Sequence, residues 1–232
     1  MTKLKVDVWS DIACPWCYVG KRHLEAALAR FPERANVEVR WRAFELDPSA
    51  PPERDRTISY AERLAKKYRA SVDEAQAMID RMVETAAHDG LDFHFDRIRS
   101  GNTFDAHRLI HLAGERGVQD AVKERLLRAY MTEGEPIGDR ETLARLAGEA
   151  GLDPEEVRAM LASDAYGAEV RVDEREAADL GIHGVPCFVF GEKLAVSGAQ
   201  PAEILLRALT KAYDALEPEI AEGAACGPDG CA

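Results

Sequence analysis

The spacing of apolar and polar positions changes along this chain between the period of a strand and the period of a helix. The first such changes fall within residues 4–41. Residues 4–9 are rich in the side chains that strands favour, and residues 37–41 alternate between apolar and polar. Both segments are therefore predicted to be β-strands. Between them, residues 15–31 carry apolar side chains at helical spacing and end at Pro32. The three elements predict a β-α-β unit long enough for a parallel crossover.

A long block with helical spacing, residues 50–165, follows this unit. Ser71 has Glu74 three residues after it, the pattern of a capping box, which predicts a helix that ends near residue 88. Three more side chains are predicted to cap helices in this block: Thr103, Asp139 and Asp153.

The strand pattern returns after the helical block. Residues 185–190 predict a strand, and residues 193–196 predict the second arm of a hairpin, before a last helix that begins at Pro201. The chain is therefore predicted to be an α/β protein with a large all-helical insertion. The predicted parts are a discontinuous α/β domain (1–49 and 166–217), the helical insertion (50–165) and a C-terminal tail (218–232).

Composition and charge narrow the classes of function. Of the 232 residues, 46% are hydrophobic and 31% are charged, which is ordinary for a globular protein. A formal net charge of −12 argues against a nucleic-acid surface. We see neither a secretory signal nor a run of about 20 apolar residues, so we expect a cytoplasmic protein that does not span a membrane. The five cysteines exclude complete pairing within one chain.

The chemistry is predicted to lie in Cys14-Pro15-Trp16-Cys17, between the first strand and the first helix. If Cys14 caps the helix, Pro15 takes the first helical position, where its missing N–H costs nothing. The free N–H groups of the first turn and the helix dipole then lower the pKa of Cys14, whose thiolate is the reactive species. Cys17, one turn later, is expected to be more buried and to resolve a mixed disulfide on Cys14.

Two other interpretations of the cysteine pair stay open. The pair can be half of a zinc site, or it can be two small buried side chains. Its place between a strand and a helix favours redox chemistry.

Several motifs together resemble the DsbA family, and more closely its FrnE-like branch. That branch shares a superfamily with 2-hydroxychromene-2-carboxylate isomerases and kappa-class glutathione transferases. The resemblance spans residues 3 to about 215. The segments that carry it are Val8-Trp9-Ser10-Asp11, Cys14-Pro15-Trp16-Cys17-Tyr18-Val19-Gly20, Phe44-Glu45-Leu46, Asn102-Thr103-Phe104-Asp105-Ala106-His107-Arg108-Leu109 and Gly184-Val185-Pro186-Cys187-Phe188-Val189-Phe190.

The resemblance implies a thioredoxin-like fold and dithiol–disulfide exchange with protein or small-molecule substrates, without a bound cofactor. Cys14 corresponds to the nucleophile, Cys17 to the resolving thiol, and Pro186, after Val185, to a cis-proline that shapes a substrate groove. The alternative for Pro186 is a trans-proline at the start of a strand. The resemblance also implies a role in oxidative-stress tolerance, with glutathione as a candidate reductant or ligand.

Cys226 and Cys231, four residues apart in the tail, form a second candidate redox pair that relays electrons to Cys14 and Cys17. The alternatives are two thiols on a mobile tail, or a zinc site made by both pairs. Cys187, next to Pro186, is expected to be a buried strand residue. If it faces the site instead, it can form a disulfide with Cys14.

The remaining candidate residues are neighbours of the predicted site. The resemblance places Asn102, Thr103 and His107 near it, although His107 and His111 alone indicate only surface or packing roles. Asp11 is expected to influence proton transfers at Cys14, and His183 to line the rim. Three classes of function remain: a cytosolic disulfide oxidoreductase or isomerase, a glutathione-dependent isomerase or transferase, and a metal-binding or redox-sensing protein.

Overall fold

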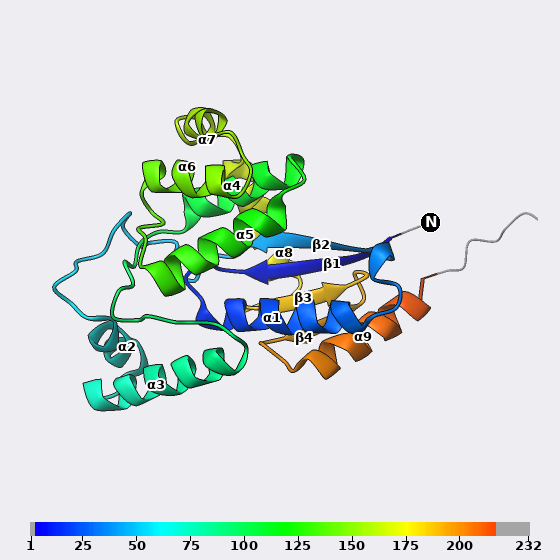
Figure 1. Ribbon diagram of the computed structural model, residues 1–232, viewed down its shortest axis with the longest axis horizontal. Coiled ribbons are helices and arrows are strands. Elements are labelled where there is room, and N and C mark those ends of the chain that lie inside the picture. The colour runs from blue at the N-terminus through cyan, green and yellow to red at the C-terminus, as the bar shows by residue number, and fades with distance from the viewer. Residues whose placement is uncertain (1–2, 217–232) are drawn as a thin grey trace, which may run out of the picture.

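The computed structural model describes residues 3–216, which form a four-stranded sheet with helices on both faces (Figure 1). The strands are β1 (Leu4–Ser10), β2 (Val37–Ala43), β3 (Cys187–Phe190) and β4 (Leu194–Ser197). Their order in the sheet is β2-β1-β3-β4. β1 is parallel to β2 and antiparallel to β3, and β3 is antiparallel to β4. The predicted crossover and hairpin are therefore both present.

The helices follow the predicted order, with one after β1, a series after β2, one before β3 and one after β4. Their bounds are α1 (Pro15–Arg30), α2 (Tyr60–Tyr68), α3 (Val72–His88), α4 (Phe104–Glu115), α5 (Gln119–Arg128), α6 (Arg140–Glu149), α7 (Pro154–Leu161), α8 (Gly167–Asp179) and α9 (Ala202–Asp214). A 3-10 turn (Arg34–Asn36) precedes β2, and a π-helical turn (Ala129–Glu133) extends α5. In the described part of the chain, none of the helices is long and apolar enough to cross a membrane.

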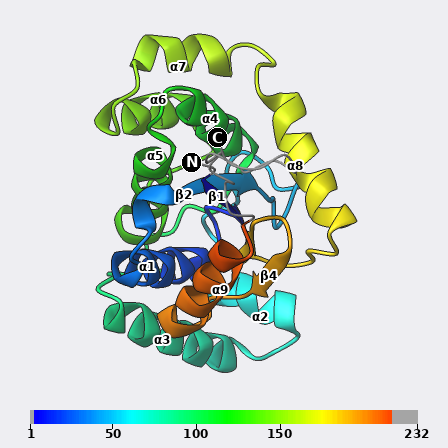
Figure 2. The ribbon, with the colours of Figure 1, turned by 90° about the vertical axis from the view of Figure 1, so that its right-hand side faces the viewer.

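The alternation of side chains in β1 determines what covers each face of the sheet. Leu4, Val6 and Val8 are buried in the main core, whereas Trp9 belongs to a smaller cluster with Ala177 of α8. Figure 2 shows α1, α5 and α9 on one side of the sheet and α8 on the other, and Lys21 of α1 pairs with Asp120 of α5. Residues that point to opposite faces of β1 and β3 therefore lie in different environments.

The helix caps confirm most of the predictions and correct one. Ser71 and Glu74 form the predicted capping box, and the side chains of Asp139 and Asp153 accept hydrogen bonds from the first turns of α6 and α7. The prediction that Thr103 caps the next helix is wrong. Thr103 occupies the cap position, but the Asn102 Oδ1 accepts the Phe104 N–H at 2.8 Å instead.

Candidate active site

Cys14 and Cys17 lie where β1 ends and α1 begins. Cys14 has extended backbone angles at the cap position, and Pro15 is the first helical residue, as predicted. Cys14 is 5% exposed and Cys17 only 1%, whereas Trp16 between them is 47% exposed. The helix start therefore presents the edge of the first sulfur and hides the second.

The two sulfurs have opposite acid–base properties. A hydrogen bond from the Cys17 thiol lowers the pKa of Cys14, and the N–H groups of Cys17 and Trp16 add to this effect. Burial raises the pKa of Cys17 well above its ordinary value, and the hydrogen bond to Cys14 raises it further. The environment therefore favours the ionised form of Cys14 and disfavours that of Cys17.

The loop before β3 lies against Cys14. The Val185–Pro186 bond is cis, and the Val185 carbonyl oxygen lies 3.6 Å from the Cys14 Sγ. A Cβ on Gly20 of α1 would lie 2.9 Å from the Pro186 Cγ and 3.1 Å from the Phe188 Cζ. Glycine at this position therefore lets the proline loop approach the helix that carries the cysteines.

Three buried charged or titratable side chains lie beneath the cysteines: Asp11, His107 and Lys123. The Asp11 Oδ1 is 3.5 Å from the His107 Nε2, and its Oδ2 accepts the Leu46 N–H at 2.8 Å. Burial opposes ionisation of Asp11, but His107 and the backbone N–H groups lower its pKa below the ordinary value. The expectation that Asp11 lies near Cys14 is met, and the surface role considered for His107 is wrong.

Lys123 is the residue of this site that the sequence analysis missed. It is 1% exposed, its Nζ lies 3.5 Å from the Ser10 carbonyl oxygen, and it lies over the Trp41 ring at 5.6 Å from the centroid. Burial lowers its pKa to about 8, although electrostatic interactions with Cys17 and Asp11 oppose this shift. It comes from α5, within the segment predicted only as part of the helical insertion.

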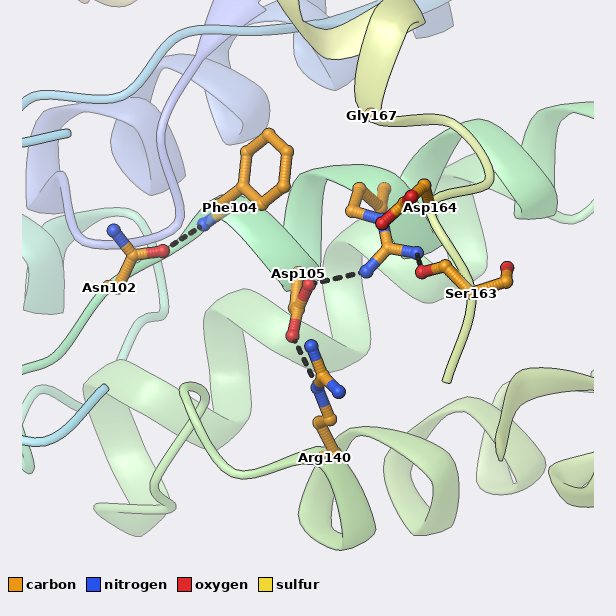
Figure 3. A pocket seen from close by; sticks show the side chains of 8 residues that line it. Asn102, Phe104, Asp105, Arg140, Ser163, Asp164 and Gly167 are labelled. Carbon is orange, nitrogen blue, oxygen red and sulfur yellow. Dashed lines mark hydrogen bonds and ion pairs between the residues drawn. The ribbon is translucent and has the colours of Figure 1, made fainter. Parts of the chain in front are cut away.

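Asn102 and Thr103 do not contact the cysteines. Asn102 lines a pocket of about 270 Å³ together with Phe104 and Gly167 (Figure 3), and its Nδ2 donates to the Glu45 Oε1 at 3.3 Å. Thr103 is buried at the start of α4. Of this segment, therefore, only His107 contacts a residue of the cysteine loop.

Cys187 is buried on the sheet face opposite α1. This agrees with the expectation that it is a buried strand residue. It packs with Trp9 and Ala177, whereas its neighbour Phe188 belongs to the main core. This alternation contradicts the alternative in which Cys187 faces the site and forms a disulfide with Cys14.

The other two histidines considered from the sequence, His111 and His183, lie outside the cysteine site. The His111 Nε2 is 3.0 Å from the buried Asp173 Oδ2, so His111 is not a surface residue. His183 is exposed before the proline loop.

An arginine-rich pocket lies between the start of α2 and residues 95–100. Its volume is about 440 Å³, and Tyr60 of α2 contributes to its wall. Burial raises the pKa of Tyr60, and the nearby negative charge of Cys14 contributes to this shift. The charged residues that line the pocket are Arg54, Arg56, Arg63, Arg97, Arg99, Asp55, Asp96 and Glu133. In a chain of net charge −12, this opening is locally positive.

The second candidate redox pair, Cys226 and Cys231, lies outside the described residues, as does the predicted tail. The zinc site that requires both pairs is therefore still a prediction. Among residues 3–216, we find no group of three or more His, Cys, Asp or Glu side chains placed to hold a metal ion.

Comparisons with known proteins agree with this geometry. A model of the DSBA-like thioredoxin domain matches residues 5–210. The crystal structure of the probable DsbA oxidoreductase SCO1869 from Streptomyces coelicolor is similar over 99% of this chain and 98% of its own, with 48% identity and a TM-score of 0.86. The uncharacterized protein YwbO of Bacillus subtilis (strain 168) is 29% identical over 207 residues, 88% of this chain and 95% of YwbO.

A more distant structure shares the fold alone. The cytosolic disulfide reductase DsbM from Pseudomonas aeruginosa, determined with GSH, has 18% identity and a TM-score of 0.63. The similarity covers 89% of this chain and 98% of DsbM.

Proposed function

This chain belongs to the family of DSBA-like thioredoxin domains, and we propose that it is a thiol–disulfide oxidoreductase whose reacting pair is Cys14 and Cys17. The thioredoxin-like fold and the DsbA resemblance expected from the sequence are confirmed. The proposal concerns the residues, the steps and the substrates. The observation that carries it is the place of the two cysteines in one helical turn, Cys14 at the cap and Cys17 buried behind it, where the pKa of Cys14 is lowered and that of Cys17 is raised.

The first step is attack by the Cys14 thiolate on a substrate disulfide. A bond forms between Cys14 and one substrate sulfur, and the other substrate sulfur leaves as a thiolate and takes a proton from water. The Val185 backbone beside Cys14 is placed to align an extended substrate strand. Trp16, largely exposed at the rim, offers that strand an apolar surface.

In the second step, Cys17 gives its proton to the neutral amine of Lys123 and attacks the Cys14 sulfur. The Cys14–Cys17 disulfide forms, the remaining substrate sulfur leaves as a thiolate, and the substrate has gained two electrons. A Lys123 pKa of about 8 makes a useful fraction of neutral amine available near neutral pH. Two molecules of an external thiol then reduce the enzyme disulfide and become one disulfide themselves.

The proposed function is tested with the purified protein. Disulfide reduction is followed on insulin, and isomerase activity on scrambled ribonuclease. We expect both activities in the wild type, none in Cys14→Ser, and a trapped mixed disulfide in Cys17→Ser. Wild-type turnover in a Cys14→Ser background, or no turnover by the wild type, would refute the proposal.

We propose that glutathione is the external thiol. We also propose that the reaction takes place in the cytoplasm. The positive pocket supports this choice, because glutathione carries two carboxylates and the charge of Cys14 acts on Tyr60 in the pocket wall. The similar fold of DsbM, a cytosolic reductase determined with GSH, is consistent with it. If glutathione reduces the enzyme, Arg56→Ala raises the glutathione concentration needed for half-maximal reduction and leaves that for dithiothreitol unchanged.

Two finer proposals concern the tail and the physiological role. We propose that Cys226 and Cys231 relay electrons to Cys14 and Cys17, and that the enzyme supports oxidative-stress tolerance. Exchange of both tail cysteines for serine should slow turnover of a disulfide substrate. Unchanged kinetics would exclude the relay.

A further inference from the structure

The arginine-rich pocket carries more positive charge than its acidic neighbours neutralise. Its lining contains five arginines and three acidic residues, which are Asp55, Asp96 and Glu133. Outside the lining, Asp47 and Glu53 each pair with one of these arginines. Arg125 and Arg128 in turn pair with Glu133. Because these outer charges cancel, the pocket keeps an excess of positive charge.

This excess lies on Arg56 and Arg63. Within residues 3–216, neither of them forms an ion pair with an acidic side chain. The Arg63 guanidinium donates to the carbonyl oxygens of Asp55 and Ile58. It also donates to the Ser100 Oγ at 3.3 Å. Carbonyl and hydroxyl oxygens hold a guanidinium in place without cancelling its charge, so it can still bind an anion.

The backbone around the pocket is fixed by contacts between segments that are distant in sequence. The Ser100 Oγ also accepts the Tyr130 hydroxyl at 3.3 Å, and the Ser100 carbonyl oxygen accepts the Arg54 N–H at 2.8 Å. A Cβ on Gly134 would lie 2.5 Å from the Arg97 carbonyl oxygen, so a glycine is needed where the π-helical turn meets this wall. A site that is already formed loses less conformational freedom when it binds a ligand.

A row of aromatic side chains connects the pocket to the helix that carries the cysteines. Tyr18, which follows Cys17, has its ring centroid 5.9 Å from that of Phe93. The Phe95 centroid lies 6.0 Å from that of Phe93 and 4.9 Å from that of Tyr60. Tyr60 and Phe95 line the pocket, and Figure 1 shows α2 at the end of the sheet where α1 begins. The rings of Tyr18 and Tyr60 are therefore less than about 17 Å apart, which is roughly five residues of extended chain.

We propose that the arginine-rich pocket binds an acidic segment of the protein substrate, so that the enzyme prefers disulfides with carboxylates about five residues from the attacked cysteine. The inference rests on the proposed function, because the bound segment belongs to the chain whose disulfide Cys14 attacks. No bond forms or breaks in the pocket. In the proposed mechanism, glutathione reduces the enzyme only after the substrate has left, so both can use the pocket in turn.

The test measures a single turnover without glutathione. The reduced enzyme converts a peptide disulfide to two thiols, and Cys14 and Cys17 become a disulfide. The peptides form pairs that differ at two adjacent residues, glutamate in one and glutamine in the other, placed two, five or eight residues from the attacked cysteine. The ratio of the two second-order rate constants is taken within each protein, so a general loss of activity cancels.

We expect the wild type to reduce the glutamate peptide about 10-fold faster than the glutamine peptide at a spacing of five, and to show a ratio near 1 at a spacing of two. Arg56→Gln and Arg63→Gln should each lower the larger ratio to about 3, and the double variant to about 1. Arg207→Gln, at an exposed position of α9, is the matched control and should keep the wild-type ratio. Circular dichroism checks each fold, and if Arg63→Gln does not fold, the exposed Arg56 decides the question.

Two results would overturn the binding of an acidic segment. One is equal rate constants for the glutamate and glutamine peptides at every spacing in the wild type. The other is a preference that Arg56→Gln and the double variant retain in full, which would place its origin elsewhere on the surface. If the wild type reduces none of the peptides, the proposed function fails instead, so the two failures are distinguishable.

Discussion

Replacement of Lys123 by methionine tests whether burial of a charged lysine under the cysteines lowers the stability of the folded protein. Burial lowers the pKa of Lys123 from 10.5 to about 8. That difference corresponds to a penalty of about 3 kcal/mol on the charged form in the folded protein. Methionine has a similar length and no charge, so Lys123→Met is expected to raise the free energy of unfolding by up to about 3 kcal/mol at pH 7, less the value of the hydrogen bond to Ser10.

The stability gained by Lys123→Met should depend on pH, because the folded and unfolded chains release the Lys123 proton at different pH values. Below pH 8, Lys123 is protonated in both the folded and the unfolded chain, and the full penalty is present. Between pH 8 and 10.5, the folded protein has released this proton while the unfolded chain still binds it, so the wild-type free energy of unfolding rises with pH. The advantage of Lys123→Met should therefore shrink across this interval and vanish near pH 10.5.

The assay is urea unfolding of both reduced proteins at several values between pH 6.5 and 10, analysed as a difference so that other titrating groups cancel. Lys66→Met, at an exposed position of α2, serves as the control and should show a small difference that does not change with pH. A loss of stability in Lys123→Met of equal size at every pH would mean that partners stabilise the ammonium, and the reasoning would be wrong.

Two further predictions concern the cysteine loop and its neighbour. Asp11→Asn removes a negative charge that raises the pKa of Cys14, so iodoacetamide should alkylate Cys14 about 3-fold faster at pH 6; an unchanged pH–rate profile would contradict this. Gly20→Ala places a Cβ 2.9 Å from the Pro186 Cγ, and the overpacking should lower the free energy of unfolding by about 1–3 kcal/mol in urea titrations. Gly184→Ala, which meets no atom within 4 Å, should be close to neutral, and equal effects of the two would argue against the contact.

The local parts of the site were predictable because their signals lie within a few residues. Proline directly after a cysteine, with a strand before and a helix after, determines that Cys14 caps α1. The alternation of side chains along β3 is another local pattern, and it indicates which sheet face Cys187 occupies. Because Phe188 packs towards α1, Cys187 must point the other way. The sequence could not show whether Asn102 or Thr103 caps α4. Both side chains suit that role, and the backbone angles decide between them.

Lys123 and His107 could not be found in this way, because their burial is a tertiary effect. Lys123 follows Val122 on an amphipathic helix, at a position where a lysine usually extends its ammonium to water. It is buried because α5 packs against β2, where Trp41 covers its side chain. His107 likewise meets Asp11 only because α4 lies beside the loop that follows β1. Neither partner is close in sequence.

These placements separate the control of the two chemical steps between two parts of the chain. In the proposed mechanism, the strand–helix junction and the proline loop provide the attacking sulfur of Cys14 and align the substrate beside it. By contrast, α4 and α5, which lie between β2 and β3 in the sequence, supply His107 and Lys123. Substitutions in these two helices should therefore change how fast a mixed disulfide is resolved without changing how fast it forms. In the proposed mechanism, a slow second step gives the substrate time to rearrange its own disulfides, so substitutions in α4 and α5 should shift the balance between reduction and isomerisation.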